Sequence, residues 1–395
     1  MGIIWLENGR KAFFNKLQRK QSMNLPHASA GLARAKMMSP YMEWAKTHAA
    51  ARYTLASSGV ASFPLADLIA LSGLRLQDLE LTSPTGYGYQ PLQQALAKKA
   101  GVPAECVVAA AGTSMANHLA MAASFEPGDE VLIEWPTYEL LLTTAEYLGA
   151  KITRFTRRFE DGFRLDPGEV ERALTPRTRL VVLTNLHNPS SALAEDDTLR
   201  QVGELAKHAG ARVLVDEVYL EACYASAWRS AVHLGHQFIV TGSLTKAYGL
   251  SGLRCGWILA EPGLARAMWR LNDFYGVNAA HPAERLSVIA LAHLPEIAAR
   301  YRTLLETNRS IVHKFLDARQ DLQVAKQPYG TVLFPRLRKG SVETLCQLLR
   351  QKYETSVVPG SFFEAPEHFR MYLAAEPSVL EEGLKRLGTA LEEIT

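Results

Sequence analysis

The stretch from Ile239 to Trp257 (IVTGSLTKAYGLSGLRCGW) gathers side chains that could do chemistry together. Ser243 stands three residues before Lys246 and Arg254 stands eight residues after it, with small residues between them. A hydroxyl and a guanidinium can grip one phosphate, and a lysine amine can form a Schiff base with an aldehyde on the same ligand. A lone lysine is more often an exposed surface charge, so this hypothesis depends on polar residues elsewhere in the chain.

A second candidate for phosphate binding is Gly112-Thr113-Ser114, which follows an apolar run and precedes a helical pattern. The free N–H groups and the dipole at a helix N-terminus favour an anion there. The alternative is plain helix capping by Thr113 or Ser114.

Asp216 ends the apolar run RVLV, where a carboxylate needs a partner. It could keep a pyridine nitrogen protonated, so that the ring withdraws electrons from a bound substrate, or it could belong to a structural ion pair. Asn188 and Tyr219 could hydrogen-bond a ring hydroxyl, and Tyr138 could cover the ring face. Each of these three could equally be an ordinary loop or core residue.

Two further positions could hold the carboxylate of an amino acid. Arg370 precedes the apolar run MYLAA, and arginine offers a planar fork that matches a carboxylate. Gly59 follows Ser58 at the end of a short extended piece, where a glycine lets the backbone approach a ligand closely. A surface arginine and a simple turn are the alternatives.

The elements that must position these residues alternate between strand and helix. Apolar strand-length runs begin at Cys106, Glu130, Lys151, Arg179, Ala211, Gln237 and Cys255, with helical patterns between most of them. This alternation predicts βαβ units, and hence an α/β fold with a mainly parallel sheet covered on both faces. In such sheets ligands bind at the carboxyl ends of the strands, which is where these polar residues fall.

Past residue 278 the pattern changes to a smaller α+β domain. Residues 284–317 predict one long helix, residues 342–353 and 378–394 predict amphipathic helices, and short strands are expected between them. We therefore expect an N-terminal arm over residues 1–35 and a large ligand-binding domain over 59–278. The small domain would comprise its N-terminal part, residues 36–58, and its C-terminal part, residues 279–395.

Composition excludes several classes of protein. The 395 residues carry 43 basic and 40 acidic side chains, and a net charge of +3 gives no face for nucleic acid or membrane. The four cysteines are scattered without paired metal spacing, so we expect free thiols and no metal. The N-terminus puts its apolar part before its basic part, the wrong order for a secretion signal. We expect a cytoplasmic protein.

With these motifs in this order, the chain resembles the fold-type I, pyridoxal-phosphate-dependent aminotransferases of class I/II. The most specific match is SLTKAYGLSGLRCGW at 243–257, which is similar to the family's lysine signature. AGT at 111–113, P-x-Y at 136–138, H-N-P at 187–189 and D-E-V-Y at 216–219 follow the family's order and distances. The resemblance covers roughly residues 50 to 390.

The resemblance implies roles for these residues. Lys246 would hold the internal aldimine with pyridoxal 5'-phosphate and then move a proton, with Asp216 and Tyr219 as its catalytic partners. The implied cofactor-binding residues are Gly112, Thr113, Ser114, Tyr138, Asn188, Asp216, Tyr219, Ser243, Lys246 and Arg254. The implied substrate-binding residues are Gly59, Asn188 and Arg370.

The family also implies a homodimer with shared active sites, in which residues 274–278 (FYGVN) would cross the interface. Two departures concern this site. The loop after Asn188 reads N-P-S-S-A and lacks the family's glycine, and the position of the family's intersubunit tyrosine is Ser83. Tyr87 from a shifted position, or no such contact, are the alternatives.

The implied activity is transfer of the amino group of an L-amino acid to a 2-oxo acid. A lyase or cyclase resembling capreomycidine synthase is the first alternative, because such enzymes share the lysine motif. A ligand-sensing module of a transcription regulator is the second alternative. Such regulators carry a winged-helix domain ahead of this fold, for which the roughly 50 preceding residues look too short.

Overall fold

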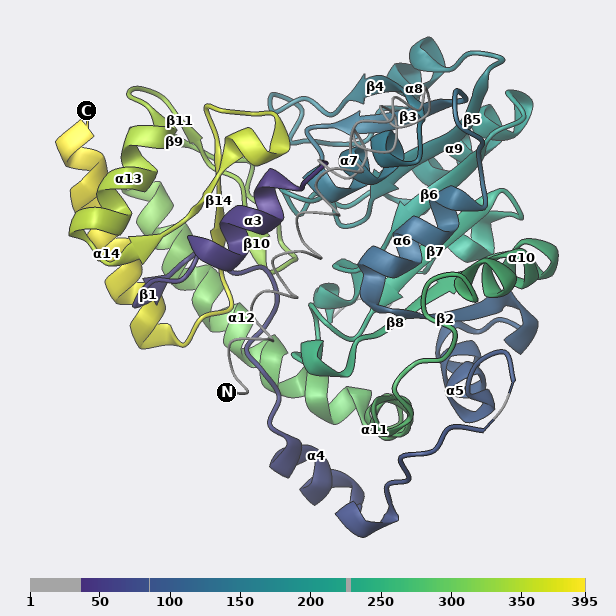
Figure 1. Cartoon of the computed structure of the whole chain (residues 1–395). Helices are drawn as coiled ribbons and strands as arrows, with labels where there is room; N and C mark the ends of the chain where they lie inside the picture. The colour runs from purple at the N-terminus through teal and green to yellow at the C-terminus, as the bar shows by residue number, and fades with distance from the viewer. Residues whose placement is uncertain (1–36, 85, 225–228, 395) are drawn as a thin grey trace, which may run out of the picture. The chain divides into compact units, whose positions relative to one another are not determined.

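Seven strands among the described residues form one sheet in the computed structural model of this chain (Figure 1). The structure describes residues 37–84, 86–224 and 229–394, so the predicted N-terminal arm lies outside it. The strands stand in the order β2-β8-β7-β6-β5-β3-β4. Their bounds are β2 (Val107–Ala111), β3 (Glu130–Trp135), β4 (Lys151–Thr156), β5 (Thr178–Thr184), β6 (Arg212–Asp216), β7 (Phe238–Ser243) and β8 (Cys255–Leu259).

The sheet is mainly parallel, as predicted. Neighbours from β4 through β3, β5 and β6 to β7 pair in parallel, whereas β8 is antiparallel to both β2 and β7. Because β8 runs the other way, its first residue, Cys255, pairs with Ala111 at the carboxyl end of β2. Arg254, just before β8, therefore lies at the same sheet edge as the ends of its neighbours.

Both faces of the sheet are buried, which explains the nearly continuous apolar runs. Successive side chains of a strand point to opposite faces: Val213 and Val215 belong to one core cluster and Leu214 to another. Helices α6, α7 and α10 contribute to the cluster around Leu214, and α5, α8 and α9 to the cluster around Val213.

The helices preceding residue 279 begin at recognisable signals. Prolines occupy the first turn of α3, α5, α8 and α10, and the Asp166 carboxylate caps α8 by accepting from Gly168 N. Their bounds are α3 (Pro40–Thr47), α4 (Leu65–Ser72), α5 (Gln90–Ala100), α6 (Gly112–Ala122), α7 (Glu139–Tyr147), α8 (Pro167–Ala173), α9 (Asp196–His208) and α10 (Pro262–Asn272). Short 3₁₀ turns are η1 (Leu76–Asp78), η2 (Ala104–Cys106), η3 (Leu220–Cys223), η4 (Ala231–Leu234), η5 (Ser251–Leu253) and η6 (Gly360–Phe363).

The long helix predicted over residues 284–317 is wrong as a single element. It divides at His293 into α11 and α12, because Pro295 in the first turn of α12 has no N–H to continue the preceding helix. The helices of this part are α11 (His281–Ala292), α12 (Leu294–Asp317), α13 (Val342–Lys352) and α14 (Pro377–Ile394).

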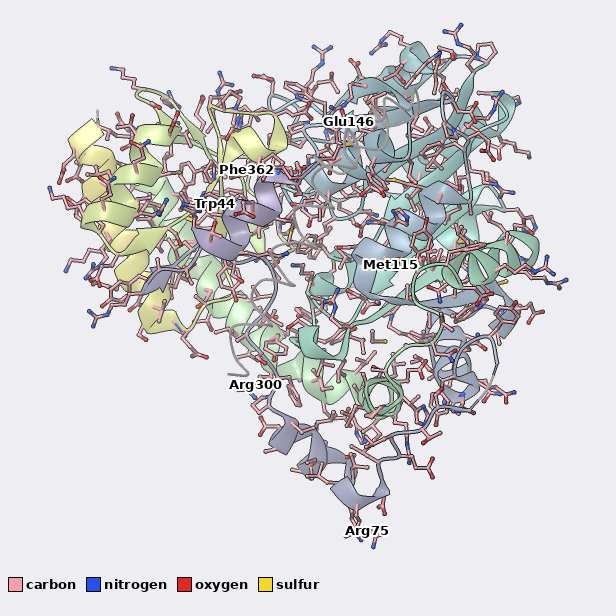
Figure 2. The ribbon with its side chains drawn as sticks, in the orientation of Figure 1. Trp44, Arg75, Met115, Glu146, Arg300 and Phe362 are labelled. Carbon is pink, nitrogen blue, oxygen red and sulfur yellow. The ribbon has the colours of Figure 1, made fainter. Side chains whose placement is uncertain are left out.

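The C-terminal part carries short strands with helices packed on them. β10, β14 and β13 form one antiparallel sheet, β9 pairs with β11, and β1 pairs with β12 in parallel. Helix α3 joins this part through Trp44, whose ring lies 5.5 Å from that of Phe362 (Figure 2). The strand bounds are β1 (Tyr53–Thr54), β9 (Leu322–Gln323), β10 (Val332–Leu333), β11 (Arg336–Leu337), β12 (Thr355–Ser356), β13 (Val358–Pro359) and β14 (Phe369–Tyr372). Among the described helices, none is long and apolar enough to cross a membrane.

Candidate active site

A cavity of about 330 Å³ opens at the carboxyl ends of the parallel strands. Residues at the strand ends line one side of it, and residues of α3 and β14 line the other. The seven-stranded sheet and the segments around the smaller sheets therefore both contribute to its wall. Ten of the twelve predicted site residues line it: Thr113, Ser114, Tyr138, Asn188, Asp216, Tyr219, Ser243, Lys246, Arg254 and Arg370. The other two, Gly59 and Gly112, support residues that line it.

The N-terminus of α6 forms one end of the cavity. Gly112 opens this helix with φ +79°, and Thr113 and Ser114 follow in its first turn. The Thr113 hydroxyl oxygen is shielded from solvent yet has no hydrogen-bond partner among the described residues. A shielded hydroxyl beside free helix N–H groups is a donor set suited to an anion.

Arg254 reaches the same end of the cavity. Its backbone is left-handed (φ +51°), and its Nη2 donates to the Ala111 carbonyl at 3.2 Å. A methyl group at Gly112 would stand 2.2 Å from that nitrogen, so only glycine lets the guanidinium lie against the start of α6. Ser243, at the end of β7, lines the cavity beside them.

Asp216 is a buried carboxylate held by two donors. Asn117 Nδ2 donates to its Oδ2 at 2.8 Å, and Val218 N donates to its Oδ1 at 3.0 Å. Burial raises the pKa of Asp216 to about 6, although both hydrogen bonds and the Lys246 charge act to lower it. No cation of the described residues forms an ion pair with this carboxylate, and a protonated ring nitrogen would supply one.

Asn117 lines the cavity but was not among the residues predicted from the sequence. It lies five positions after Gly112 on α6, is buried, and lines the cavity. The sequence does show one amide side chain among the apolar residues on the buried face of α6. That amide indicates a site only when α6 is known to face Asp216 at the end of β6. Met42, Ser58, Thr184 and Thr245 also line the cavity without having been assigned a site role.

Lys246 also lines the cavity. Its Nζ donates to Ser58 Oγ at 2.7 Å, and burial lowers the pKa of its ammonium group. Val60 N donates to the Lys246 carbonyl at 2.9 Å, and a methyl group on Gly59 would stand 3.1 Å from Lys246 Cα. The Ser58-Gly59 turn therefore packs against the lysine and fixes its backbone.

The loop that carries Asn188 is anchored by a fully buried ion pair. Arg157 Nη1 and Glu134 Oε2 lie 3.0 Å apart, and both side chains are fully buried. Glu134 Oε1 accepts from the Thr184 amide and hydroxyl at 2.8 and 2.5 Å. Thr184 Oγ1 in turn accepts from Asn188 N at 2.8 Å, so the pair fixes the end of β5.

The glycine that the sequence lacks after Asn188 is replaced by a serine in a glycine-like conformation. Ser191 has φ +64°, and its hydroxyl donates to the Val332 carbonyl at 2.8 Å. Gly330 makes room for it, because a methyl group at Gly330 would lie 2.3 Å from Ser191 Oγ. The turn therefore persists, with the side chain of Ser191 accommodated by a glycine in the C-terminal part.

Arg370 is a buried cation on β14, only 1% exposed. Its Nη1 donates to Asn188 Oδ1 and its Nη2 to Tyr41 Oη, both at 2.8 Å, while its Nε is shielded and has no acceptor among the described residues. The guanidinium also lies 4.9 Å from the centre of the Phe363 ring. No carboxylate pairs with it in the described part of the chain, so a buried positive charge faces the cavity uncompensated.

Two tyrosines complete the cofactor end. Tyr219 is buried, and desolvation raises the pKa of its hydroxyl. Tyr138 packs edge-to-face on Tyr41 with 5.6 Å between ring centres. Ser83 and Tyr87 do not line the cavity of this chain; the Tyr87 side chain is largely exposed and its hydroxyl donates to Asp273 at 3.4 Å.

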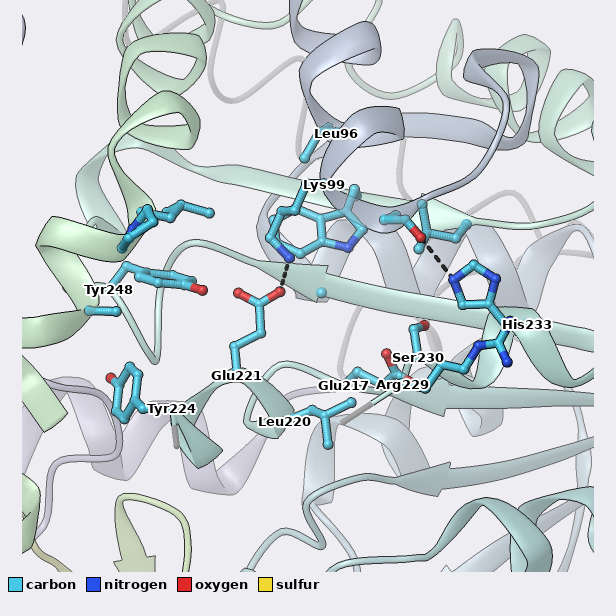
Figure 3. Close-up of a pocket in the computed structure, with 17 residues that line it drawn as sticks. Leu96, Lys99, Glu217, Leu220, Glu221, Tyr224, Arg229, Ser230, His233 and Tyr248 are labelled. Atoms are coloured by element: carbon cyan, nitrogen blue, oxygen red, sulfur yellow. Dashed lines mark hydrogen bonds and ion pairs between the residues drawn. The ribbon is translucent and has the colours of Figure 1, made fainter. Parts of the chain in front are cut away.

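A second cavity is larger, with a volume of about 630 Å³. Figure 3 shows its lining, where Glu221 pairs with Lys99 beside Tyr248. Glu217 and Gly242 line it, whereas their chain neighbours Asp216 and Ser243 line the first cavity. This division follows from strand alternation, which sends successive side chains to opposite faces. None of the twelve predicted site residues lines the larger cavity.

The residues of the first cavity fit pyridoxal 5'-phosphate. The unpartnered Thr113 hydroxyl and the glycine cradle at Gly112 suit its phosphate, and the buried Asp216 carboxylate suits its ring nitrogen. Lys246 supplies an amine of lowered pKa for the aldehyde. The fold and this site together define a pyridoxal-phosphate-dependent enzyme of fold type I.

Comparison with known proteins agrees. The family described as aminotransferase class I and II matches residues 73–387, and this chain belongs to it. Capreomycidine synthase from Streptomyces vinaceus is 29% identical over 362 residues, covering 89% of this chain and 93% of that protein. A probable aspartate/prephenate aminotransferase from Aquifex aeolicus is 27% identical over 304 residues, covering 74% and 77% of the two chains.

Among solved structures, a pyridoxal-phosphate-dependent aminotransferase from Streptococcus suis is similar over 91% of this chain and 99% of its own. The TM-score is 0.85 at 27% sequence identity. The predicted fold class, family, enzyme class and cofactor are thereby confirmed: the chain is a pyridoxal-phosphate-dependent enzyme of the class I/II aminotransferase family.

Proposed function

We propose that this protein is an aminotransferase that moves the amino group of an L-amino acid to a 2-oxo acid, with Lys246 as the residue that carries the cofactor. The observation that carries the proposal is the meeting of Lys246, Asp216 and Arg370 in one cavity. They provide an amine for the aldehyde, an anion for the ring nitrogen and a cation for the substrate carboxylate.

When bound, the cofactor withdraws electrons from the α-carbon of the attached amino acid, which makes the α-proton labile. Lys246 Nζ would be the amine that holds the cofactor through its aldehyde, and when released from it this amine would move the proton at the substrate α-carbon. Its lowered pKa suits the role of base, because more of the amine is unprotonated near neutral pH. Asp216 keeps the proton on the ring nitrogen.

The remaining predicted residues position these groups. Gly112, Thr113, Ser114, Ser243 and Arg254 bind the phosphate, and Tyr138 covers the ring. Asn188 and Tyr219 hydrogen-bond the ring oxygen. The substrate carboxylate binds Arg370, assisted by Asn188 and the backbone at Gly59.

The test is a panel of amino donors offered to the holoenzyme with pyruvate, with 2-oxoglutarate, and with no acceptor. We expect a 2-oxo acid from the donor only when an acceptor is present, in equal amount to the new amino acid. Lys246→Ala is expected to lose this turnover, and steady-state transamination by that variant would refute the assignment.

A second candidate is a lyase or cyclase that uses the same residues. It is favoured by the 29% identity to capreomycidine synthase, which spans 89% of this chain. The same panel separates the two: product formed without any 2-oxo acid, with ammonia released or a ring closed, favours this candidate.

We also propose the domain division and the assembly expected from the sequence. Residues 59–278 would form the cofactor domain, and 36–58 with 279–395 the smaller one, supported by the pairing of β1 with β12. We keep the cytoplasmic location as a proposal. The homodimer with shared active sites is supported by the exposed Phe274 and Val277, 83% and 63% accessible. Light scattering of the purified holoenzyme tests the dimer, for which a monomer mass is the contrary result.

A further inference from the structure

We infer that the hydroxyl of Tyr41 is a second donor to the α-carboxylate of the substrate, acting beside Arg370, and this inference rests on the proposed function. Tyr41 lies in the first turn of α3, is 7% exposed and lines the cavity. None of the motifs that point to the cofactor includes it.

The hydrogen bond between the two residues has a fixed direction. A guanidinium can only donate, so Arg370 Nη2 donates to Tyr41 Oη, at 2.8 Å. The hydroxyl hydrogen of Tyr41 is therefore not used in this bond, and Tyr41 Oη donates to no described residue. A carboxylate that approaches Arg370 meets this hydrogen as well as the guanidinium.

The position of Tyr41 is set by packing and not by the hydrogen bond alone. Its ring meets Tyr138 edge-to-face at 5.6 Å and Phe362 and Phe363 at 5.7 and 6.1 Å. The side chain of Ser39 caps α3 by accepting from Met42 N at 3.1 Å, which fixes the turn that carries Tyr41. A donor held this firmly adds affinity without having to be ordered when the substrate binds.

The charge at this end of the cavity supports the same assignment. Arg370 is fully desolvated, and its two hydrogen bonds go to neutral oxygens, those of Asn188 and Tyr41. A neutral donor beside an uncompensated buried cation favours an anion over a neutral ligand. Amino acid and 2-oxo acid both carry such a carboxylate, so Tyr41 is a positioning residue for both half-reactions.

The test uses 2-methylalanine, an amino acid without an α-proton, and isopropylamine, which has the same branching without a carboxylate. Binding of each to the holoenzyme is followed by the absorbance of the bound cofactor. Tyr41→Phe is expected to weaken 2-methylalanine about tenfold while isopropylamine changes by less than about twofold. In turnover, KM for donor and acceptor rises and kcat stays within about twofold.

Tyr372→Phe is the matched control. This substitution also removes a buried tyrosine hydroxyl, but from β14. The Tyr372 hydroxyl donates to the Ala374 carbonyl at 2.6 Å, and Tyr372 does not line the cavity. It should leave the affinity ratio of the two ligands unchanged. Tyr41→Asn, whose amide is too short to reach the position of the tyrosine hydroxyl, provides a second variant should Tyr41→Phe not fold, and it too should weaken only 2-methylalanine.

The outcomes separate this inference from the proposed function. If 2-methylalanine binds wild type and Tyr41→Phe equally, or binds the variant more tightly, Tyr41 is not a donor, and the proposed function stands. Equal weakening of both ligands assigns Tyr41 a structural role and overturns the inference. If neither ligand perturbs the cofactor of the wild type, the proposed function fails and the inference with it.

Discussion

Asn117 Nδ2 donates to Asp216 Oδ2 across 2.8 Å, joining helix α6 to the end of strand β6. Thr241 Oγ1 donates to Asn117 Oδ1 at 2.6 Å, so the amide of Asn117 is held with its NH₂ towards the carboxylate. This relay connects helix α6, whose N-terminus we propose binds the phosphate, to Asp216, which we propose faces the cofactor ring. It also places a neutral donor, and not a cation, beside the buried charge.

Asn117→Leu should therefore weaken cofactor binding. It removes a hydrogen bond to a buried ionised group, a contribution of about 1.5–3 kcal/mol, and we expect a loss of affinity of about 10- to 100-fold. Titration of the apoenzyme with pyridoxal 5'-phosphate measures it. His118→Asn, on the same helix but outside the cavity, is the control; equal affinities for wild type and Asn117→Leu would contradict this role.

The pKa of about 6 at Asp216 predicts a pH dependence. Since burial raises the pKa of this acid on folding, its contribution to apoenzyme stability is present at low pH and lost as pH rises through about 6. Burial makes the ionised form of Asp216 unfavourable, and a cation on the cofactor ring would offset this cost only when Asp216 is ionised. The gain in Tm on adding cofactor should therefore be larger at pH 7.5 than at pH 5.

Asp216→Asn is the variant that isolates this effect. It cannot ionise, so its Tm gain on adding cofactor should lose most of the difference between the two pH values. Glu217, whose pKa burial raises to about 7, titrates in both states and cancels in the comparison. A Tm gain in wild type that is the same at both pH values would speak against the pairing of Asp216 with the ring.

Gly112→Ala tests the phosphate cradle. The new methyl group would stand 2.2 Å from Arg254 Nη2, so the guanidinium must leave its place. We expect binding of pyridoxal 5'-phosphate to weaken by about 100-fold, about 2.7 kcal/mol, while pyridoxal, which lacks the phosphate, binds both proteins alike. Gly128→Ala, also at positive φ but with nothing near its added methyl, controls for backbone strain.

Ser191 and Gly330 offer a test of how the asparagine loop is held. Gly330→Ala should lower the free energy of unfolding by about 1–3 kcal/mol, because its methyl group would lie 2.3 Å from Ser191 Oγ. In a Ser191→Gly background the cost should fall by about 1 kcal/mol. Urea unfolding of the four proteins measures this coupling, and strictly additive effects would show that the two residues do not meet.

Much of this site was predictable from local sequence, because each predicted residue stands next to an apolar strand or a helix start. Asp216 after RVLV and Gly112 before a helix identify a strand end and a helix N-terminus. Parallel strands then bring such ends to one edge, as Figure 1 shows for β5, β6 and β7. The cavity at that edge contains ten of the twelve residues.

What the sequence did not predict depends on contacts between distant segments. Asn117 was recognised as a site residue only through its hydrogen bond to Asp216, 99 positions away. The hydrogen bond between Arg370 and Tyr41 likewise joins residues 329 positions apart. The missing glycine after Asn188 is compensated by Gly330 from another part of the chain. Pro295 could have predicted the break between α11 and α12. The helical spacing of apolar residues continues across the break, however, and it led to the prediction of one helix.

The central claim is that Lys246 carries the cofactor. Reduction of the holoenzyme with borohydride makes a Schiff base permanent, and mass spectrometry of the digested protein then locates the modified residue. We predict a single phosphopyridoxyl group, on Lys246, and none in Lys246→Ala, whichever reaction the enzyme performs. A label on another lysine, or a wild-type holoenzyme that carries no label after reduction, would contradict the assignment.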